Sequence, residues 1–556
     1  MYRQVLDPVS HSLGLTSIFA LAPLACLFVL LGVLRLKAQW AALAALGVAL
    51  VVALAVYSMP VGQAADAGLE GAAFGLFPIM WIVVNAVWIY RMTEETGHFL
   101  GLRRAFETIS SDQRIQVIAI AFCFGALLEA LAGFGTPVAI CGVMMVGLGI
   151  RPVKAAAIAL VADTAPVAFG AIAIPITTLS QVSGLHVHPL SQMVGRQTPF
   201  LALVLPFVLV GMVDGRRGLR DTWPAALVAG AVFAAGQFAC SNYISTPLTD
   251  IVASLLSAAA LVAFLRVWSP GSIETTTAGA HPAVAGAAAS DPAFEREIIE
   301  RRGSGDEGPR RPVSTLAAFA PYLIIIVVLG LQSLHAIQIH LESATNSFKW
   351  PGLDVLNAKG KAPTSEIFKL NYLTAAGTGL FVSGLLSMLV LRLSPRRAVV
   401  AYGRTLAELK WAIFTVATVL AIAYVMNLSG QTITLGMWAA GAGGFFAFLS
   451  PLIGWFGTAV TGSDTSTNSL FGALQVAAAK QSGLSPTLLA AANSSGGVVA
   501  KMVSPQNLAI GAAAVGFGGR EGEIFRQVIG WSVLFVLGVA VLVLLQSTSA
   551  LSWMVP

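Results

Sequence analysis

The sequence has few charged residues for its length. Of 556 residues, 32 are Lys or Arg and 26 are Asp or Glu, which is 10% of the chain against roughly 25% in soluble proteins. Hydrophobic residues make up 56%, and the mean hydropathy is +0.81. A soluble protein could not bury that much apolar surface, which excludes a cytosolic enzyme, a nucleic-acid-binding module and a disordered chain. We expect an all-α polytopic membrane protein, because about 20 apolar residues per crossing allow about 10 to 14 transmembrane helices.

Cysteine is also scarce, and its pattern excludes a metal site. The four cysteines lie inside apolar runs without metal-type spacing, so we expect packed thiols, no metal and no cofactor. They are Cys26, Cys123, Cys141 and Cys240. A cleavable leader is not expected either, since the first apolar run, 13–34, lacks a small-residue cleavage motif and is followed by Arg35 and Lys37. This run is predicted to be a transmembrane span.

The distribution of charge predicts the domain division and the orientation in the membrane. Residues 291–311 hold 11 of the charged side chains, and together with the preceding Ala/Gly/Thr/Pro stretch they form a predicted linker over 269–313. It separates an N-terminal half, 1–268, from a C-terminal half, 314–556. Lys and Arg cluster in the segments predicted to be cytoplasmic, and the linker is one of them. Both termini and the loop 335–369 are then predicted to lie outside, although that loop carries four Lys.

Two regions do not fit simple membrane-crossing helices. In the first, a predicted re-entrant hairpin over 115–150 is interrupted by GFGTP at 133–137, and a helix over 152–178 is broken at Asp163. In the second, a predicted hairpin over 438–482 contains GSDTSTN at 462–468, and a broken helix covers 486–518. The charge pattern gives the two regions opposite orientations. Inverted repeats with discontinuous helices are typical of secondary transporters.

The breaks predict an anion-binding site. Irregular backbone is tolerated in a membrane only where it lines a cavity, and a half-helix N-terminus offers free N–H groups to an anion. Thr136 is a predicted N-cap of the second hairpin arm, with Pro137 after it. The alternative is that these small residues are ordinary helix contacts. The predicted substrate-binding residues are Gly133, Gly135, Thr136, Thr164, Ser463, Asp464, Thr465, Ser466, Asn493, Ser494, Ser495 and Gln506.

Ionisable residues within the apolar runs are few, and each is a functional candidate because its burial is costly. Either Glu129 or Asp163 is predicted to carry the coupling proton, since burial disfavours a charged carboxylate. Lys501 is predicted to pair with an acidic side chain or with the substrate. Arg196 begins a predicted span, where it either anchors the outer mouth or captures substrate. A structural salt bridge is the alternative for each of the buried groups.

Several long strings resemble the lactate permease family of bacterial inner-membrane carriers. They include FCFGALLEALAGFGTPVAI at 122–140, TGSDTSTNSLFGALQ at 461–475 and NSSGGVVAKMVSPQNLAI at 493–510, and the similarity runs from the first helix to the last. The resemblance implies proton-coupled symport of L-lactate, often with D-lactate and glycolate. More distantly, the paired hairpins and broken helices resemble the ion-transporter superfamily of carboxylate carriers. Members of the family often begin the first break with Asn, whereas this chain has Asp163, which adds a titratable group.

Three alternatives remain open at the level of the sequence. A sodium-coupled or dicarboxylate carrier would use the same scaffold, and an anion channel would show neither saturation nor coupling. A membrane-embedded enzyme is the third alternative, but the chain has no HExxH motif, no GxSxG motif and no acidic metal cluster. We therefore expect a transporter, with a small monocarboxylate and protons as its ligands and no nucleic-acid partner.

Overall fold

The computed structural model describes residues 1–34, 36–107, 109–131, 133, 135–270, 315–358, 360, 362–363, 366–517 and 520–556. Within these residues the chain is almost entirely helical, with two small two-stranded sheets. Eight helical segments are long and apolar enough to cross a membrane, or nine if a pair bent by 64° counts as one span. The linker predicted over 269–313 lies outside the described residues from residue 271 onward.

The elements before the linker are one short strand and helices that range from 5 to 42 residues in length. They are β1 (Tyr2–Arg3), α1 (Leu13–Phe28), α2 (Ala38–Ala55), α3 (Val61–Phe74), α4 (Trp81–Glu95), α5 (His98–Glu107), α6 (Gln113–Val117), α7 (Gly125–Leu131), α8 (Thr136–Gly147), α9 (Pro152–Ala162), α10 (Gly170–Ser183), α11 (Val187–Val194), α12 (Thr198–Ala239) and α13 (Thr249–Leu265). Helix α12 turns back at Gly215, which has a φ of +61°, so that a Cβ on Gly230 would meet the carbonyl oxygen of Leu203. It therefore forms two arms that lie side by side.

The elements after the linker include the remaining strands. They are α16 (Thr315–Ser333), α17 (His335–Glu342), β2 (Asn346–Lys349), β3 (Val355–Leu356), β4 (Ile367–Leu370), α18 (Ala376–Val390), α19 (Pro395–Ser429), α20 (Gln431–Ala439), α21 (Phe446–Thr461), α22 (Asp464–Ser482), α23 (Pro486–Ala500), α24 (Pro505–Ala514) and α25 (Glu521–Gln546). Strand β1 pairs in parallel with β3, and β2 pairs antiparallel with β4. Helix starts follow the capping rules, because the hydroxyls of Ser463, Ser485 and Ser504 accept N–H bonds from the first turns of α22, α23 and α24.

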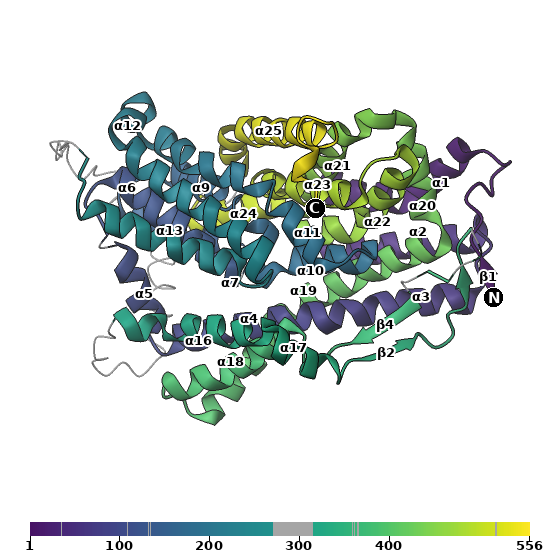
Figure 1. Ribbon diagram of the computed structural model, residues 1–556, viewed down its shortest axis with the longest axis horizontal. Coiled ribbons are helices and arrows are strands. Elements are labelled where there is room, and N and C mark those ends of the chain that lie inside the picture. The colour runs from purple at the N-terminus through teal and green to yellow at the C-terminus, as the bar shows by residue number, and fades with distance from the viewer. Residues whose placement is uncertain are drawn as a thin grey trace.

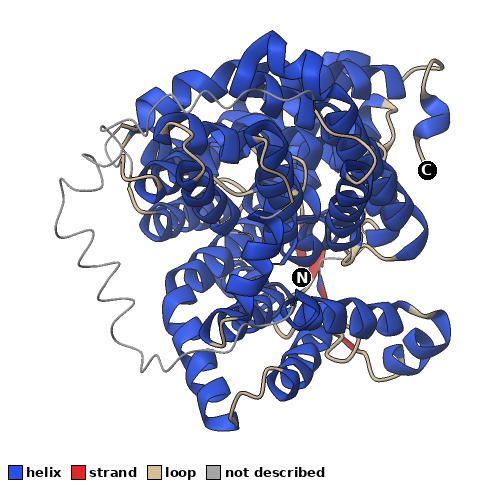
Figure 2. Ribbon diagram, turned by 90° about the vertical axis from the view of Figure 1, so that its left-hand side faces the viewer, coloured by secondary structure: helices blue, strands red, loops and turns tan. Residues whose placement is uncertain are grey.

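The helices lie in two tiers (Figures 1 and 2). The lower tier in Figure 1 contains α3, α4, α16, α17 and α18, with the β2–β4 sheet at one end. The upper tier contains the two hairpin regions together with α12, α13 and α25. Segments from both sides of the linker meet in the packing, since α4 packs on α18 and α3 packs on α19. Helix α19 also contacts α22, and it thereby connects the two tiers.

The first hairpin region lies inside the protein rather than against lipid. The most apolar window of Gln113–Leu131 is 94% buried, whereas that of the first helix is 33% buried. Its second arm, α8, has 12 residues and a length of roughly 18 Å, too short to cross a hydrocarbon core of about 30 Å. Helix α9 and the helical segment from Val167 are bent by 64° at the break. The short α8 and the bend of 64° fit the predicted re-entrant hairpin and the predicted break at Asp163, and the re-entrant topology stays a prediction.

The second region repeats this pattern with one difference in its details. Helices α21 and α22 form the hairpin arms, and the first arm begins at Phe446 after a 3-10 segment, Ala440–Phe445. Helix α23 runs without interruption to Ala500, and the break follows at Lys501–Ser504. Asn493, Ser494 and Ser495 therefore lie within a regular helix rather than in the break. The close contact of α21 and α23 requires glycine, because a Cβ on Gly496 would meet the Pro451 carbonyl.

Candidate functional site

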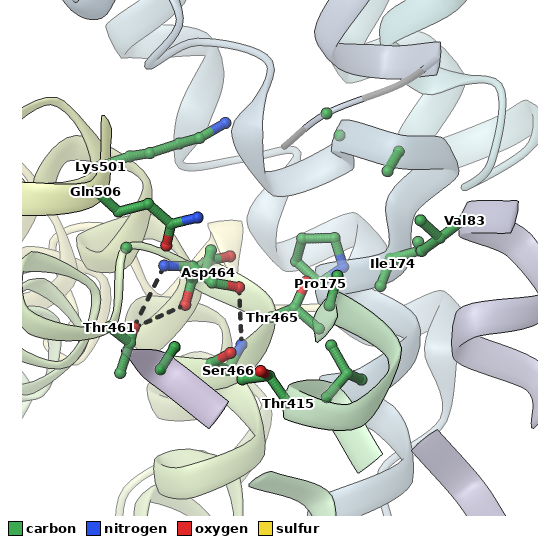
Figure 3. Close-up of a pocket in the computed structure, with 18 of the residues that line it drawn as sticks. Val83, Ile174, Pro175, Thr415, Thr461, Asp464, Thr465, Ser466, Lys501 and Gln506 are labelled. Carbon is green, nitrogen blue, oxygen red and sulfur yellow. Dashed lines mark hydrogen bonds between the residues drawn. The ribbon is translucent and has the colours of Figure 1, made fainter. Parts of the chain in front are cut away.

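A cavity of about 290 Å³ lies where the hairpin tips and helix breaks meet α19 (Figure 3). Its walls come from both hairpin regions, from the start of α2, from α4 with the segment before it, and from the middle of α19. Polar side chains occupy one side and apolar side chains such as Ile174 and Val83 the other (Figure 3). The predicted residues that line it are Gly133, Ser463, Asp464, Thr465, Ser466, Gln506, Glu129 and Lys501. A cavity of this size suits a small polar molecule.

The tip of the second hairpin is held in a specific conformation. Gly462 ends α21 with a φ of +76°, and a Cβ there would lie 2.8 Å from the Gln506 side-chain oxygen. Ser463 then caps α22 by accepting the Ser466 N–H at 3.2 Å. Because glycine adopts a positive φ at little cost, the chain can reverse here and still place Gln506 against the tip. The N-terminus of α22 consequently faces the cavity.

Asp464 is the first residue of α22 and is 3% exposed. Its Oδ2 accepts hydrogen bonds from Ser494 Oγ at 2.6 Å and from Asn468 Nδ2 at 3.2 Å. Its Oδ1 has no hydrogen-bond partner among the described residues. The helix N-terminus stabilises a carboxylate at this position. Asp464 thus presents Oδ1 to the cavity as a hydrogen-bond acceptor, while Ser494 and Asn468 hold its Oδ2.

The tip of the first hairpin is packed more tightly. Gly133 and Gly135 both have positive φ, at +56° and +80°. A Cβ on Gly135 would lie 2.6 Å from Ile510 Cδ1, so this tip is in close contact with α24. Thr136 is the first residue of α8, and its predicted role as the N-cap is wrong, because Gly135 occupies the cap and makes no side-chain bond. Gly135 reverses the chain, which leaves the following residue already helical.

A buried cluster of three charges lies beside the cavity. Lys501 Nζ is 2.6 Å from Glu129 Oε1 and 2.9 Å from Asp163 Oδ2. The side chains of the three residues are at most 8% exposed. Glu129 and Lys501 line the cavity, whereas Asp163 does not. Glu129 Oε2 and Asp163 Oδ1 have no hydrogen-bond partner in the part of the chain that the structure describes, so the lysine is the main stabiliser of both carboxylates.

Tight backbone packing fixes the position of Glu129. A Cβ on Gly170 would lie 2.8 Å from Glu129 Oε1, so the start of α10 presses on this carboxyl group. The next residues, Ala171, Ile172 and Ala173, have left-handed φ values of +42°, +61° and +59°. Such values cost L-residues roughly 1–2 kcal/mol each. Strain of this kind concentrates at functional sites, and here it borders the cavity.

Several predicted residues lie behind the cavity wall. Asn493 donates to Asn468 Oδ1 at 2.9 Å, and its own oxygen accepts from Gln475. Ser494 donates to Asp464, and Ser495 donates to Gln197 Oε1 at 2.7 Å. The contacts of Asn493 and Ser494 orient the second hairpin relative to α23 and so support Asp464 in the cavity wall, whereas Ser495 connects α23 to Gln197 at the start of α12.

Four other predicted residues do not reach the cavity wall. Gly135, Thr136 and Thr164 are not among its lining residues, and the Thr164 hydroxyl is buried without a partner among the described residues. Arg196 donates from Nε to Asn242 Oδ1 and from Nη1 to the Met554 carbonyl, both at 2.9 Å. These bonds connect Arg196 to the C-terminal segment, as expected of the anchoring alternative.

The structure adds polar residues that sequence reasoning missed. Asn507 lines the cavity and donates to the Gly462 carbonyl at 3.2 Å. The sequence could have indicated Asn507, since it directly follows the predicted residue Gln506 after the second break. Thr461 had a similar signal next to GSDTSTN, whereas Gln39 and Thr415 come from distant helices and had none. Among the described residues, no group of three His, Cys, Asp or Glu residues is arranged to hold a metal ion.

Comparisons with known proteins place the chain among membrane transporters. A family model described as L-lactate permease matches residues 16–549. The glycolate permease GlcA of Escherichia coli (strain K12) is 41% identical over 549 residues, which cover 96% of each chain. The L-lactate permease of Bacillus subtilis (strain 168) is 40% identical over 576 residues, the whole of both chains. The solved structure of Neisseria gonorrhoeae MtrF has a TM-score of 0.45 at 13% identity and covers 86% of this chain and 82% of its own.

Proposed function

Since the chain belongs to the L-lactate permease family, and is therefore a multi-pass membrane transporter and not an enzyme, we propose that it carries L-lactate together with a proton. D-lactate and glycolate are the proposed further substrates, and the bacterial inner membrane is the proposed location. The observation that carries this proposal is the cluster of Lys501, Glu129 and Asp163 at the edge of a small cavity.

The cavity supports a substrate with one carboxylate. Lys501 is the only Lys or Arg among the described residues that line it. The N-termini of α22 and α24 also contribute lining residues, and helix N-termini attract anions. A dicarboxylate would require a second cationic site. The α-hydroxyl group of lactate or glycolate then donates to Asp464 Oδ1, which has no partner, or accepts from the amide of Gln506 or Asn507.

Charge balance supports coupling to a proton. With both carboxyl groups ionised, the cluster of one lysine and two acids carries a net charge of −1. A lactate carboxylate that binds Lys501 displaces Glu129, and the cluster would then carry −2 in a poorly solvated site, which is costly. One proton on the displaced Glu129 restores −1. Glu129 is proposed rather than Asp163 because only Glu129 lines the cavity.

The packing of the two hairpin regions supports alternating access. Helix α8 of the first region packs on α24 of the second, and α22 of the second packs on α10 of the first. This reciprocal contact is what two inverted repeats around one site would give. In this proposal the regions 115–178 and 438–518 move against the remaining helices, and the linker 269–313 joins the two halves on the cytoplasmic side.

Uptake by purified protein in proteoliposomes tests the proposal. L-lactate should accumulate with an imposed pH gradient, with or without sodium, and a protonophore should abolish the accumulation. Glycolate should compete, whereas succinate should not. Glu129→Gln should retain lactate exchange but lose accumulation driven by the pH gradient, because its neutral side chain no longer needs the proton. Sodium-dependent uptake, or competition by succinate alone, would contradict the proposed substrate and coupling ion.

A further inference from the structure

A third buried acid lies outside the cluster that the proposed mechanism uses. Asp250 is in the first turn of α13 and is 0% exposed. Its Oδ1 accepts a hydrogen bond from Gln237 Nε2 at 2.9 Å, and its Oδ2 has no hydrogen-bond partner among the residues that the structure describes. No ion pair with Lys, Arg or His is formed by Asp250 within the described part of the chain. An intramembrane carboxyl group without a cation is a functional candidate by default.

The same glutamine connects Asp250 to the first broken helix. Gln237 Nε2 also donates to the carbonyl of Ala165 at 3.3 Å, and Ala165 is two residues beyond Asp163. Its Oε1 accepts from Thr198 Oγ1 at 3.1 Å. The neighbouring Gln197 accepts from Ser495 of α23. The Gln237 amide therefore joins Asp250 to the irregular backbone of the break. Gln197, which directly precedes Thr198, contacts α23 in the second hairpin region.

We propose that Asp250 is a second proton-binding site, and that its protonation controls the rearrangement of the first broken helix. This inference rests on the proposed transport function, but it concerns the conformational step and not the coupling proton. The Gln237 amide and the N-terminus of α13 favour the ionised carboxylate. Complete burial without a counter-ion favours the neutral acid. Because these two influences oppose each other, a rearrangement around Asp250 changes whether its carboxyl group is ionised.

The electrostatic surroundings of Asp250 contain few other ionisable groups. Helix α13 packs on α12, α7, α10 and the π-helical segments Ile118–Phe124 and Cys240–Ile244. The groups that interact electrostatically with Asp250 are Glu129 from α7 and the thiol of Cys240. An ionised Asp250 repels an ionised Glu129, so a proton on either acid makes ionisation of the other less costly. Deprotonation of Asp250 while Gln237 holds Ala165 should therefore hinder movement of the break.

Lactate exchange in proteoliposomes at equal pH on both sides tests this inference, because exchange requires the conformational step but no net proton movement. The wild-type rate should fall as the pH is raised. Glu129→Gln should lose gradient-driven accumulation but retain a pH dependence of exchange, because its lactate binding needs no proton whereas Asp250 can still ionise. Asp250→Asn keeps an oxygen for Gln237 and cannot ionise, so the double variant Glu129→Gln/Asp250→Asn should exchange lactate at a rate that does not vary with pH. A double variant with the same pH profile as Glu129→Gln would overturn the inference.

A second variant keeps the test decisive if Asp250→Asn does not fold. Gln237→Met removes the amide that favours the ionised carboxylate and also its bond to Ala165, so the fall in exchange rate should move to higher pH or disappear. An unchanged pH profile in Gln237→Met would also overturn the inference. Failure of wild-type protein to accumulate lactate with a pH gradient would instead contradict the proposed function, since exchange does not depend on that gradient.

Discussion

Lys501 and Asp163 occupy matching positions at the two helix breaks. Each is the C-cap of the first half of its broken helix, α23 for Lys501 and α9 for Asp163. A helix C-terminus stabilises a cation and destabilises an anion. Lys501 therefore suits its position, whereas Asp163 depends on the lysine 2.9 Å away. The ion pair between Lys501 and Asp163 therefore joins the two hairpin regions at their helix breaks.

Replacing Lys501 should expose that dependence. Lys501→Met keeps much of the side-chain length and leaves Glu129 and Asp163 buried without a cation, a loss that typically costs about 3–5 kcal/mol. We expect a lower thermal unfolding midpoint at neutral pH and no lactate accumulation. The midpoint should rise as the pH is lowered, because protonation of both acids removes the uncompensated charge.

Thermal unfolding in detergent at several pH values measures this effect. Lys480→Met is the matched control, since Lys480 is exposed in the last turn of α22 and its loss should leave the midpoint nearly unchanged. A Lys501→Met protein that is as stable as wild type at neutral pH and still accumulates lactate would contradict the assigned role of the lysine.

At the scale of elements, the start of α10 is where local preference and tertiary structure disagree. Three residues without glycine's freedom, Ala171 to Ala173, have left-handed φ values. They are enclosed by Gly133, whose Cβ would lie 3.3 Å from the Ala171 methyl, and by Glu129 next to Gly170. The close packing of the hairpin tip against the broken helix imposes this conformation. The sequence pattern predicted a break at Asp163, but it predicted neither the irregular backbone at Ala171–Ala173 nor its left-handed conformation.

Ala171→Gly should therefore stabilise the protein, which is unusual for a change to glycine in a helix. The positive φ costs alanine roughly 1–2 kcal/mol, and glycine does not incur this cost. We expect an increase in the thermal unfolding midpoint. Ala259→Gly in α13 is the control with the opposite sign, because Ala259 is exposed within a regular helix where glycine costs about 1 kcal/mol. Equal destabilisation by both changes would argue against a strained left-handed turn.

At the scale of the whole molecule, segments predicted to lie on one side of the membrane do come together. The Tyr2 hydroxyl donates to the carbonyls of Tyr57 and Ser429, and β1 pairs with β3 in the loop 335–369. The charge pattern assigns all of these segments to the outside. The cavity, by contrast, is lined by Gln39 at the start of α2, close in sequence to Lys37, which is assigned to the inside. Which side is cytoplasmic remains a prediction.

Cysteine labelling tests both the orientation and the access to the cavity. In a protein without its native cysteines, Gln39→Cys should react with a membrane-impermeant maleimide in inside-out vesicles, and lactate should slow the reaction. Ser347→Cys in the exposed strand β2 should react in intact cells and be insensitive to lactate. Reaction of Gln39→Cys only from the outside would reverse the predicted orientation.

The sequence by itself determined the class of the protein and most of the chemistry of its site. Low charge and long apolar runs require membrane helices, and the breaks at Asp163 and around 462–468 were visible because irregular polar segments are rare within such runs. Glu129, Asp464 and Lys501 were evident for the same reason, since an ionisable residue in an apolar run has few structural explanations.

Only the tertiary structure decided which of these residues meet. Lys501 lies 372 positions from Glu129 along the chain, and no local pattern specifies a contact over that distance. The structure also places the second break at Lys501–Ser504, after the NSSGG string at 493–497, because Gly496 and its neighbours serve the contact between α21 and α23. Small residues in a membrane helix either unwind it or let another helix approach closely. The packing partner decides which of the two occurs, and that partner is distant in sequence.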